Sequence, residues 1–158
     1  MSDLTHFDDQ GQSRMVDVGE KPVTARMARA SGQVIMAAET LTLIRDGGHK
    51  KGNVLEVARL AGIMGAKQTQ YLIPLCHSLA LDSVTIDFEF PDERTLAVSA
   101  TAKVEAKTGV EMEALTAVSI AAVTVYDMCK AVDRSMTISN IQLEETAGVR
   151  SGPYIRHP

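Results

Sequence analysis

The stretch VTIDFEFPDERTLAVSATAKV, residues 84–104, decides the fold class of this chain. Apolar and polar residues alternate from Val84 to Phe90, and the alternation resumes from Leu96 to Val104. A period of two places successive side chains on opposite faces of a strand, as in an antiparallel sheet with one buried face. Pro91-Asp92 interrupts the pattern with turn residues. The stretch therefore predicts an antiparallel hairpin.

A helix is predicted on the N-terminal side of this hairpin. Asn53 and Glu56 have the spacing of a capping box, in which the two side chains cap the first helical turn. The helix must end before Pro74, which disfavours helical geometry in the residue before it. Apolar residues at helical spacing predict its buried stripe, namely Val54, Val57, Ala58, Ala61 and Met64, widened by Leu60 and Ile63.

A second and longer helix is predicted after the hairpin, from about Gly109 to Val132. Thr108 and Glu111 have the spacing of another capping box. The middle of this helix, Ala117 to Val125, carries no charge and is apolar on every side. Such a helix must be covered on more than one face. Its small residues also permit close approach, so a second subunit is a candidate partner.

The remaining elements complete a split β-α-β pattern. A strand is predicted from Val23 to Met36 with a bend at Gly32, and a short helix from Glu39 to Arg45. A last strand spans Met136 to Glu144 with a bulge at Ser139-Asn140, and a short strand is expected at Met15–Val18. This order predicts an α+β fold: a ferredoxin-like antiparallel sheet packed on helices, with an extra early helix. We expect a flexible N-terminal arm (1–20), one domain (21–152) and a flexible tail (153–158).

Composition excludes several classes of protein. The chain has 158 residues, 16 basic and 20 acidic side chains and a net charge of −4. This balance argues against nonspecific binding to nucleic acid or membranes, which needs a basic face. Cys76 and Cys129 are far apart, no signal peptide precedes them, and no apolar run reaches the length of a membrane span. We therefore expect a cytoplasmic protein with reduced thiols and no dedicated metal site.

The segment LIPLCHS, residues 72–78, is the first candidate for chemistry. Pro74 ends the first long helix, so Cys76 and His77 lie on a rigid exit loop. An imidazole there can contact a phosphate or transfer a proton near neutral pH. The alternative is a surface or capping histidine.

Four charged residues of the second long helix are further candidates. Glu111 is explained as the capping partner of Thr108. Glu113 has two interpretations: a carboxylate stabilised by the helix dipole, or a residue that takes part in catalysis or binding. Asp127 and Lys130 share one face, as a surface ion pair or an acid/base couple. Glu113 and Asp127 are 14 residues apart, which is ~21 Å along a helix. If both act at one site, two copies of the chain must contribute to it.

Basic residues elsewhere are weaker candidates. Arg26 lies in the first strand, Lys67 on the first long helix, and Lys51 beside the N-terminus of that helix. Backbone N–H groups at a helix N-terminus can bind a phosphate group, and the positive charge of a neighbouring lysine strengthens that binding. Lysines in helix-entry loops are also commonly only solvated.

Together these segments resemble one known family. The strings are LTHFDDQGQSRMVDV (4–18), HKKGNVLEVARLAGIMGAK (49–67), LIPLCH (72–77), KTGVEMEALTA (107–117) and VYDMCKAVDR (125–134). They are similar to the MoaC-type cyclic pyranopterin monophosphate synthases, in that family's order and spacing, from about Leu4 to Gly152.

The resemblance implies a homohexamer, a trimer of dimers, with active sites at the dimer interfaces. The substrate would be a cyclic 3′,8-dihydroguanosine triphosphate, and the products cyclic pyranopterin monophosphate and pyrophosphate, for molybdenum cofactor. No cofactor would be permanently bound, and magnesium would come with the substrate phosphates. The implied catalytic residues are Asp127, Lys130 and Lys51; the implied substrate-binding residues are Leu75, Cys76, His77, Met112, Glu113, Arg26 and Lys67.

Two segments depart from the family pattern. Where the family reads KSGGKSG, this chain has TAGVRSG (146–152), so Thr146 and Arg150 replace lysines. Where it reads KRTxDLIPLCHP, this chain has KQTQYLIPLCHS (67–78), so Gln68, Tyr71 and Ser78 differ. Threonine cannot neutralise a phosphate, and arginine can do so only as a fixed cation. The alternatives to an active synthase are a weak or inactive homologue that binds the nucleotide as a regulatory module, or an unrelated ferredoxin-like binding module.

Overall fold

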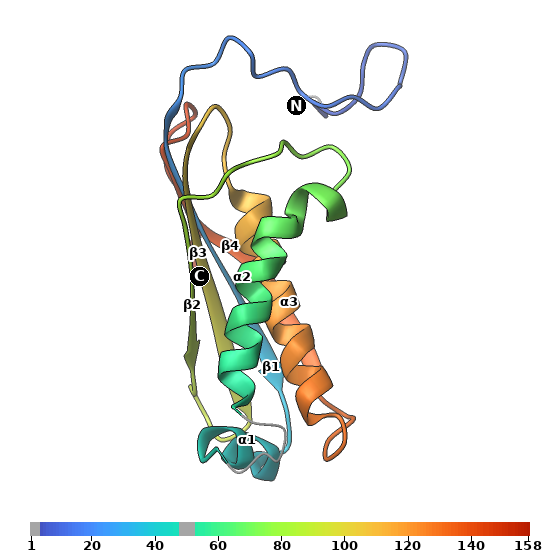
Figure 1. The fold of residues 1–158 in the computed structure, drawn as a ribbon, viewed down its shortest axis with the longest axis vertical. Helices are drawn as coiled ribbons and strands as arrows, with labels where there is room; N and C mark the ends of the chain where they lie inside the picture. The colour runs from blue at the N-terminus through green and yellow to red at the C-terminus, as the bar shows by residue number, and fades with distance from the viewer. Residues whose placement is uncertain (1–3, 48–52) are drawn as a thin grey trace.

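In the computed structural model, which describes residues 4–47 and 53–158, an antiparallel sheet carries helices on one face (Figure 1). Its strands run in the order β2-β3-β1-β4-β5. The elements in chain order are β1 (Thr24–Ile35), α1 (Ala38–Arg45), α2 (Val54–Leu72), β2 (Ser83–Glu89), β3 (Thr95–Ala106), α3 (Glu111–Cys129), β4 (Thr137–Ala147) and β5 (Tyr154–Ile155). The predicted α+β class, the hairpin and the extra early helix are confirmed.

The long helices α2 and α3 lie side by side on the sheet and pack through small residues (Figure 1). A Cβ atom added at Gly62 would lie 2.9 Å from the carbonyl oxygen of Ala117, and one at Gly65 would lie 2.9 Å from Cβ of Ile120. The backbones of the two helices therefore approach closely. The predicted stripe on α2 is partly wrong. Val54 and Ala58 are buried, but the exposed residues include Val57, Leu60 and Met64.

Helix α3 is the most apolar element and forms the centre of the core. Ala114, Ala117, Val118, Ala121 and Ala122 are completely buried against α2 and the sheet. Within the described part of the chain, α3 is the one helix long and apolar enough to cross a membrane. Half of that apolar segment is buried inside the fold, so its composition is explained by its place in the core.

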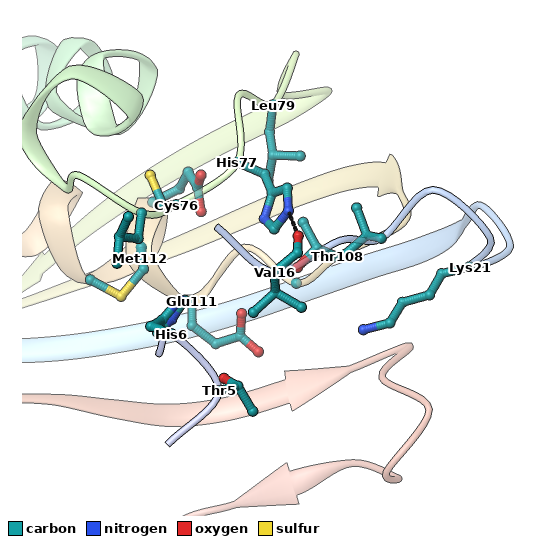
Figure 2. Close-up of a pocket in the computed structure, with 14 residues that line it drawn as sticks. Thr5, His6, Val16, Lys21, Cys76, His77, Leu79, Thr108, Glu111 and Met112 are labelled. Carbon is teal, nitrogen blue, oxygen red and sulfur yellow. Dashed lines mark hydrogen bonds between the residues drawn. The ribbon is translucent and has the colours of Figure 1, made fainter. Parts of the chain in front are cut away.

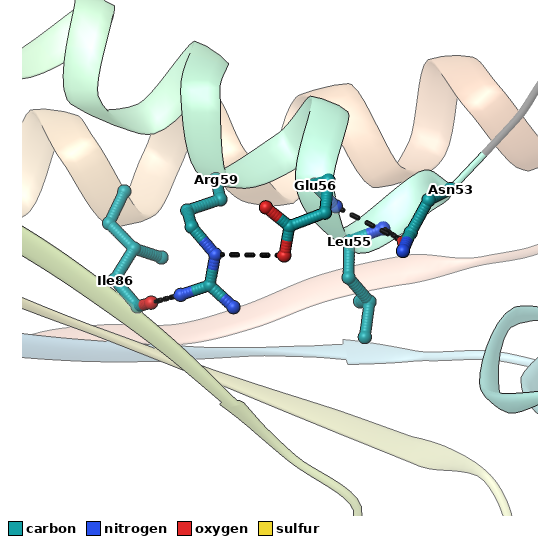
Figure 3. A network of polar contacts seen from close by, with 5 residues as sticks. All are labelled: Asn53, Leu55, Glu56, Arg59 and Ile86. Carbon is teal, nitrogen blue, oxygen red and sulfur yellow. Dashed lines mark hydrogen bonds and ion pairs between the residues drawn. The ribbon is translucent and has the colours of Figure 1, made fainter.

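The start of α2 is fixed to β2 by a polar network (Figure 3). The Asn53 side chain caps the helix by accepting hydrogen bonds from the backbone N–H groups of Leu55 and Glu56. The reciprocal half of the predicted capping box is wrong, because Glu56 pairs with Arg59 at 3.1 Å. Arg59 also donates to the carbonyl of Ile86 and lies over the Phe88 ring.

The outer segments differ from the expectation in two places and agree with it in a third. Residues 15–18 form no strand; instead an isolated bridge between Phe7 and Ser13 closes a small hairpin in the arm. The predicted bulge in β4 is confirmed by a register shift opposite Ser31–Gln33, where Asn140 has a φ of 53°. The segment expected to be a tail contributes β5, which pairs with β4.

Candidate functional site

A cavity of about 320 Å³ lies at the end of the molecule where α2 ends and α3 begins (Figure 2). We refer to it as the arm cavity, because the N-terminal arm closes one of its sides. Three segments line it: the arm, the loop that follows α2, and the first turn of α3. Its lining residues are Thr5, His6, Val16, Val18, Lys21, Leu75, Cys76, His77, Leu79, Thr108, Gly109, Glu111, Met112 and Glu113.

The loop after α2 presents Leu75, Cys76 and His77 to this cavity. Helix α2 ends at Leu72, two residues before Pro74, as the sequence predicted. The backbone N–H of Cys76 then donates to the carbonyl of Ile73, which turns the chain. Burial, and next the nearby charge of Glu113, raise the pKa of the Cys76 thiol. Its sulfur is thereby kept protonated and is a poor nucleophile.

His77 is held by the arm. Its Nε2 lies 2.6 Å from the carbonyl oxygen of Val16, a contact drawn in Figure 2. A carbonyl oxygen can only accept a hydrogen bond, so Nε2 must carry the proton in this contact. In the neutral ring Nδ1 is then the acceptor, and this atom remains for other interactions.

Glu113 is the most perturbed acid of the site. It is 4% exposed at the start of α3. Burial raises its pKa to about 7; the charge of Glu111 adds to the rise, and a hydrogen bond from its own backbone N–H opposes it. A carboxyl group with this pKa exchanges a proton near neutral pH, which is the property of a general acid or base.

Glu111 does not have the structural role that the sequence predicted. The residue that caps α3 is Val110, and it makes no side-chain capping hydrogen bond. The Thr108–Glu111 capping box is therefore wrong. The carboxylate of Glu111 instead folds back over Gly109, where an added Cβ would come within 2.5 Å of it. Glu111 thereby lines the arm cavity and belongs with the candidate site residues.

Asp127 and Lys130 lie at the opposite end of α3. Their side chains form an ion pair of 2.6 Å, and both are more than half exposed. The loop after Lys130 is fixed by Asp133, whose buried carboxylate accepts hydrogen bonds from the backbone N–H of Ala37 and the hydroxyl of Thr40. Because α3 is continuous from Glu111 to Cys129, one chain does not bring this pair to the arm cavity.

The three predicted basic residues lie in different places. Lys51 lies outside the described residues. Arg26 is 7% exposed and lines a second cavity between the start of β1 and the end of β4. Lys67 is exposed on α2 and lines a third cavity next to the loop before β2.

The residues that depart from the family pattern are also placed. Thr146 is 4% exposed and lies opposite Ala28 in the sheet, so its side chain is enclosed. Gln68 and Tyr71 are exposed on the last turns of α2 and are not among the residues that line the arm cavity. Any effect of these two substitutions on that cavity is therefore indirect.

Five of the ten predicted site residues, Leu75, Cys76, His77, Met112 and Glu113, meet in the arm cavity. The sequence patterns did not indicate His6 and Val16 of the arm, or Lys21 directly after it. The string at residues 4–18 was the available signal for His6 and Val16, because it belongs to the family resemblance. Among the described residues, no group of three or more His, Cys, Asp or Glu side chains is placed to hold a metal ion.

Comparison with known proteins identifies the family. Residues 15–149 match the family model described as the MoaC family. Cyclic pyranopterin monophosphate synthase 3 of Mycobacterium tuberculosis is 57% identical over 154 residues, covering 98% of this chain and 87% of that protein. The cyclic pyranopterin monophosphate synthase of Desulfitobacterium hafniense is 55% identical, covering 98% of this chain and 94% of that protein. That of Brevibacillus brevis is 55% identical, with coverages of 97% and 96%. This chain belongs to the MoaC family.

Proposed function

We propose that this chain is a cyclic pyranopterin monophosphate synthase of molybdenum cofactor biosynthesis. It converts a cyclic 3′,8-dihydroguanosine triphosphate to cyclic pyranopterin monophosphate and pyrophosphate, and is thus a lyase. The observation that carries this proposal is the 55–57% identity, over nearly the whole chain, to proteins of that name. The two free cysteines agree with a cytoplasmic location.

The proposed roles follow the two ends of α3. In the arm cavity, the residues from Leu75 to His77, with Met112 and Glu113, bind the organic part of the substrate. At the far end, Asp127 and Lys130 form the acid/base pair, and Lys51 is the further catalytic lysine. Rebuilding a purine-derived ring requires several proton transfers, which need such groups held in place. Arg26 and Lys67 contact phosphates. A magnesium ion would be held by the substrate phosphates, because the cavity around Arg26 has two further cations, Lys21 and Arg150, and Glu20 as the one acid in its described lining.

A complete site then needs two chains. Asp127 lies 14 residues beyond Glu113 on one continuous helix, or ~21 Å, which exceeds the reach of groups acting on one ring system. The arm cavity of one subunit must therefore face the Asp127 end of α3 from another. We propose the homohexamer, a trimer of dimers, as the assembly that provides this arrangement, and light scattering on a size-exclusion column measures it.

The test of the function is a coupled turnover assay. The purified protein is mixed with the cyclic dihydroguanosine triphosphate, freshly made by the upstream radical enzyme, and pyrophosphate and pterin are quantified. We expect many product molecules per subunit. Tight nucleotide binding with no turnover would contradict the synthase function and point to a regulatory module.

A further inference from the structure

The N-terminal arm closes one side of the arm cavity, yet few contacts join it to the fold. No residue of its described part, 4–20, is buried. In the part of the chain that the structure describes, two hydrogen bonds join the arm to the rest of the molecule. One links the Val16 carbonyl to His77 at 2.6 Å, and the other links the Gly19 carbonyl to Lys107 at 2.7 Å. Segments with few buried contacts open at a low cost in free energy, so the arm is the wall of the cavity that opens most easily.

The outer part of the arm keeps its own shape. The bridge between Phe7 and Ser13 closes the small hairpin, and the Asp8 carboxylate accepts hydrogen bonds from the backbone N–H groups of Gln10 and Gln12. These contacts are all internal to the hairpin, so it can move without losing them. Figure 1 shows the arm in blue, running across the end of the fold.

The root of the arm is held to the fold at Gly19. The Asp17 carboxylate accepts the backbone N–H of Gly19 at 2.8 Å, and the Lys107 ammonium group donates to the carbonyl of the same residue. The backbone N–H of Lys21 closes the turn by donating to the Val18 carbonyl. Lys107 therefore fixes a point beside which the arm can pivot.

Between its root and its hairpin, the arm faces the cavity. Val16 and Val18 are half-buried and line it, and Thr5 and His6 line it as well. The Val16 carbonyl also accepts the hydrogen bond from His77 (Figure 2). When the arm lifts, the cavity loses these side chains, and His77 loses the partner that keeps its proton on Nε2. Closure of the arm therefore shapes the cavity and sets the tautomer of His77.

We propose that the arm is a lid that lifts to admit the nucleotide and closes over it, and that Lys107 is a positioning residue that anchors this lid at Gly19. The inference rests on the proposed function, because the arm cavity is the candidate binding site. Lys107 is not among the residues that line that cavity, so it acts through the arm. A closed lid excludes water from the ring chemistry and holds the nucleotide in place.

Limited proteolysis measures lid opening without any nucleotide. Arg14 is the single site for trypsin in residues 1–20, and a protease cleaves segments that have left the fold. Lys107→Met removes the anchor and keeps the length of the side chain. The matched control is Lys103→Met, at an exposed position of β3 that does not line the arm cavity.

Loss of the anchoring hydrogen bond should speed cleavage after Arg14, followed by mass spectrometry, by about three- to tenfold in Lys107→Met. Lys107→Arg should restore slow cleavage, and the control should match wild type, with equal melting temperatures throughout. Cleavage that is no faster in Lys107→Met than in the control would refute the positioning role.

The closing of the lid is tested with the nucleotide. Asp127→Asn, which we expect to bind the cyclic dihydroguanosine triphosphate without converting it, is saturated with that nucleotide, and calorimetry confirms the binding. Cleavage after Arg14 should slow by at least about fivefold. A nucleotide that binds but leaves the cleavage rate unchanged would refute the lid and leave the function standing. If neither wild type nor this variant binds the nucleotide, the proposed function is contradicted, and the ligand-free cleavage rates still decide the role of Lys107.

Steady-state kinetics separate positioning from a general loss of structure. Lys107→Met should raise KM for the nucleotide by about three- to tenfold. Its kcat should change by less than about twofold, because saturating nucleotide drives the lid closed. An unchanged KM, or a KM raised equally in Lys103→Met, would contradict the assignment.

Discussion

Replacing Glu113 with glutamine removes a buried carboxyl group from the arm cavity while keeping its shape. The pKa of Glu113 is about 7 in the folded protein, against 4.5 for the ordinary side chain. The folded state therefore holds the proton more tightly than the unfolded state. Below pH 4.5 the carboxyl group of Glu113 is protonated in both the folded and the unfolded state, so its ionisation does not affect the free energy of unfolding. The cost of ionising a buried acid appears between pH 4.5 and 7 and is constant above pH 7.

The size of this effect follows from the shift of about 2.5 pKa units. At 1.36 kcal/mol per unit, ionised Glu113 destabilises the fold by up to about 3 kcal/mol above pH 7. The Glu113→Gln variant avoids that cost. We expect its free energy of unfolding, relative to wild type, to rise by that order between pH 4.5 and pH 8. The same variant should lose turnover, because an amide cannot exchange the proton.

The assay is chemical denaturation from pH 4.5 to 8.5 at one fixed protein concentration, because assembly also stabilises the folded state. Glu89→Gln is the control, since it makes the same substitution at an exposed position of β2 that does not line the arm cavity. A stability difference between Glu113→Gln and wild type that stays constant with pH would refute the assignment of a buried, proton-exchanging acid.

Three further predictions concern the rest of the fold and site. Asp127→Asn should lower kcat by roughly 10²- to 10⁴-fold with the oligomer intact on size-exclusion chromatography; an active variant, or one that falls to monomers, would contradict the acid/base role. Gly62→Ala should destabilise the fold by about 1–3 kcal/mol in thermal melts, since its Cβ would press on Ala117. An unchanged melting temperature would show that the close contact between α2 and α3 at Gly62 does not contribute to stability. Thr146→Lys should change kcat by less than about threefold if Arg150 provides the needed cation; a gain of orders of magnitude in turnover assays would show that the natural chain is a degraded enzyme.

The elements with strong periodicity could be predicted from the sequence. The alternation around Phe88 and Val98 gave the hairpin, and the uncharged middle of α3 correctly indicated a helix covered on several sides. The contact face of α2 could not be found in this way. Its buried positions include Gly62 and Gly65, which allow α3 to approach closely. Glycine is not hydrophobic, so a pattern of hydrophobic residues does not reveal these contact positions.

Sequence reasoning also misread local capping. Thr108 and Glu111 have the correct spacing for a capping box, but α3 begins at Glu111, two residues after the predicted start at Gly109, and its N-cap, Val110, makes no side-chain hydrogen bond. The Glu111 side chain folds back over Gly109 and lines the arm cavity instead of capping the helix. The contact between His77 and Val16 spans 61 residues and involves a backbone carbonyl, so no side-chain pattern could indicate it.

The proposed synthase site joins the arm cavity of one chain to the Asp127 end of α3 from another chain. The most direct test mixes two inactive variants, His77→Ala and Asp127→Asn, by unfolding and refolding them together before the turnover assay. In a two-fold dimer with shared sites, random mixing leaves about a quarter of the sites with both residues intact. We predict recovery to about a quarter of wild-type turnover. Mixed assemblies that remain inactive, when refolded wild type is active, would contradict the shared site.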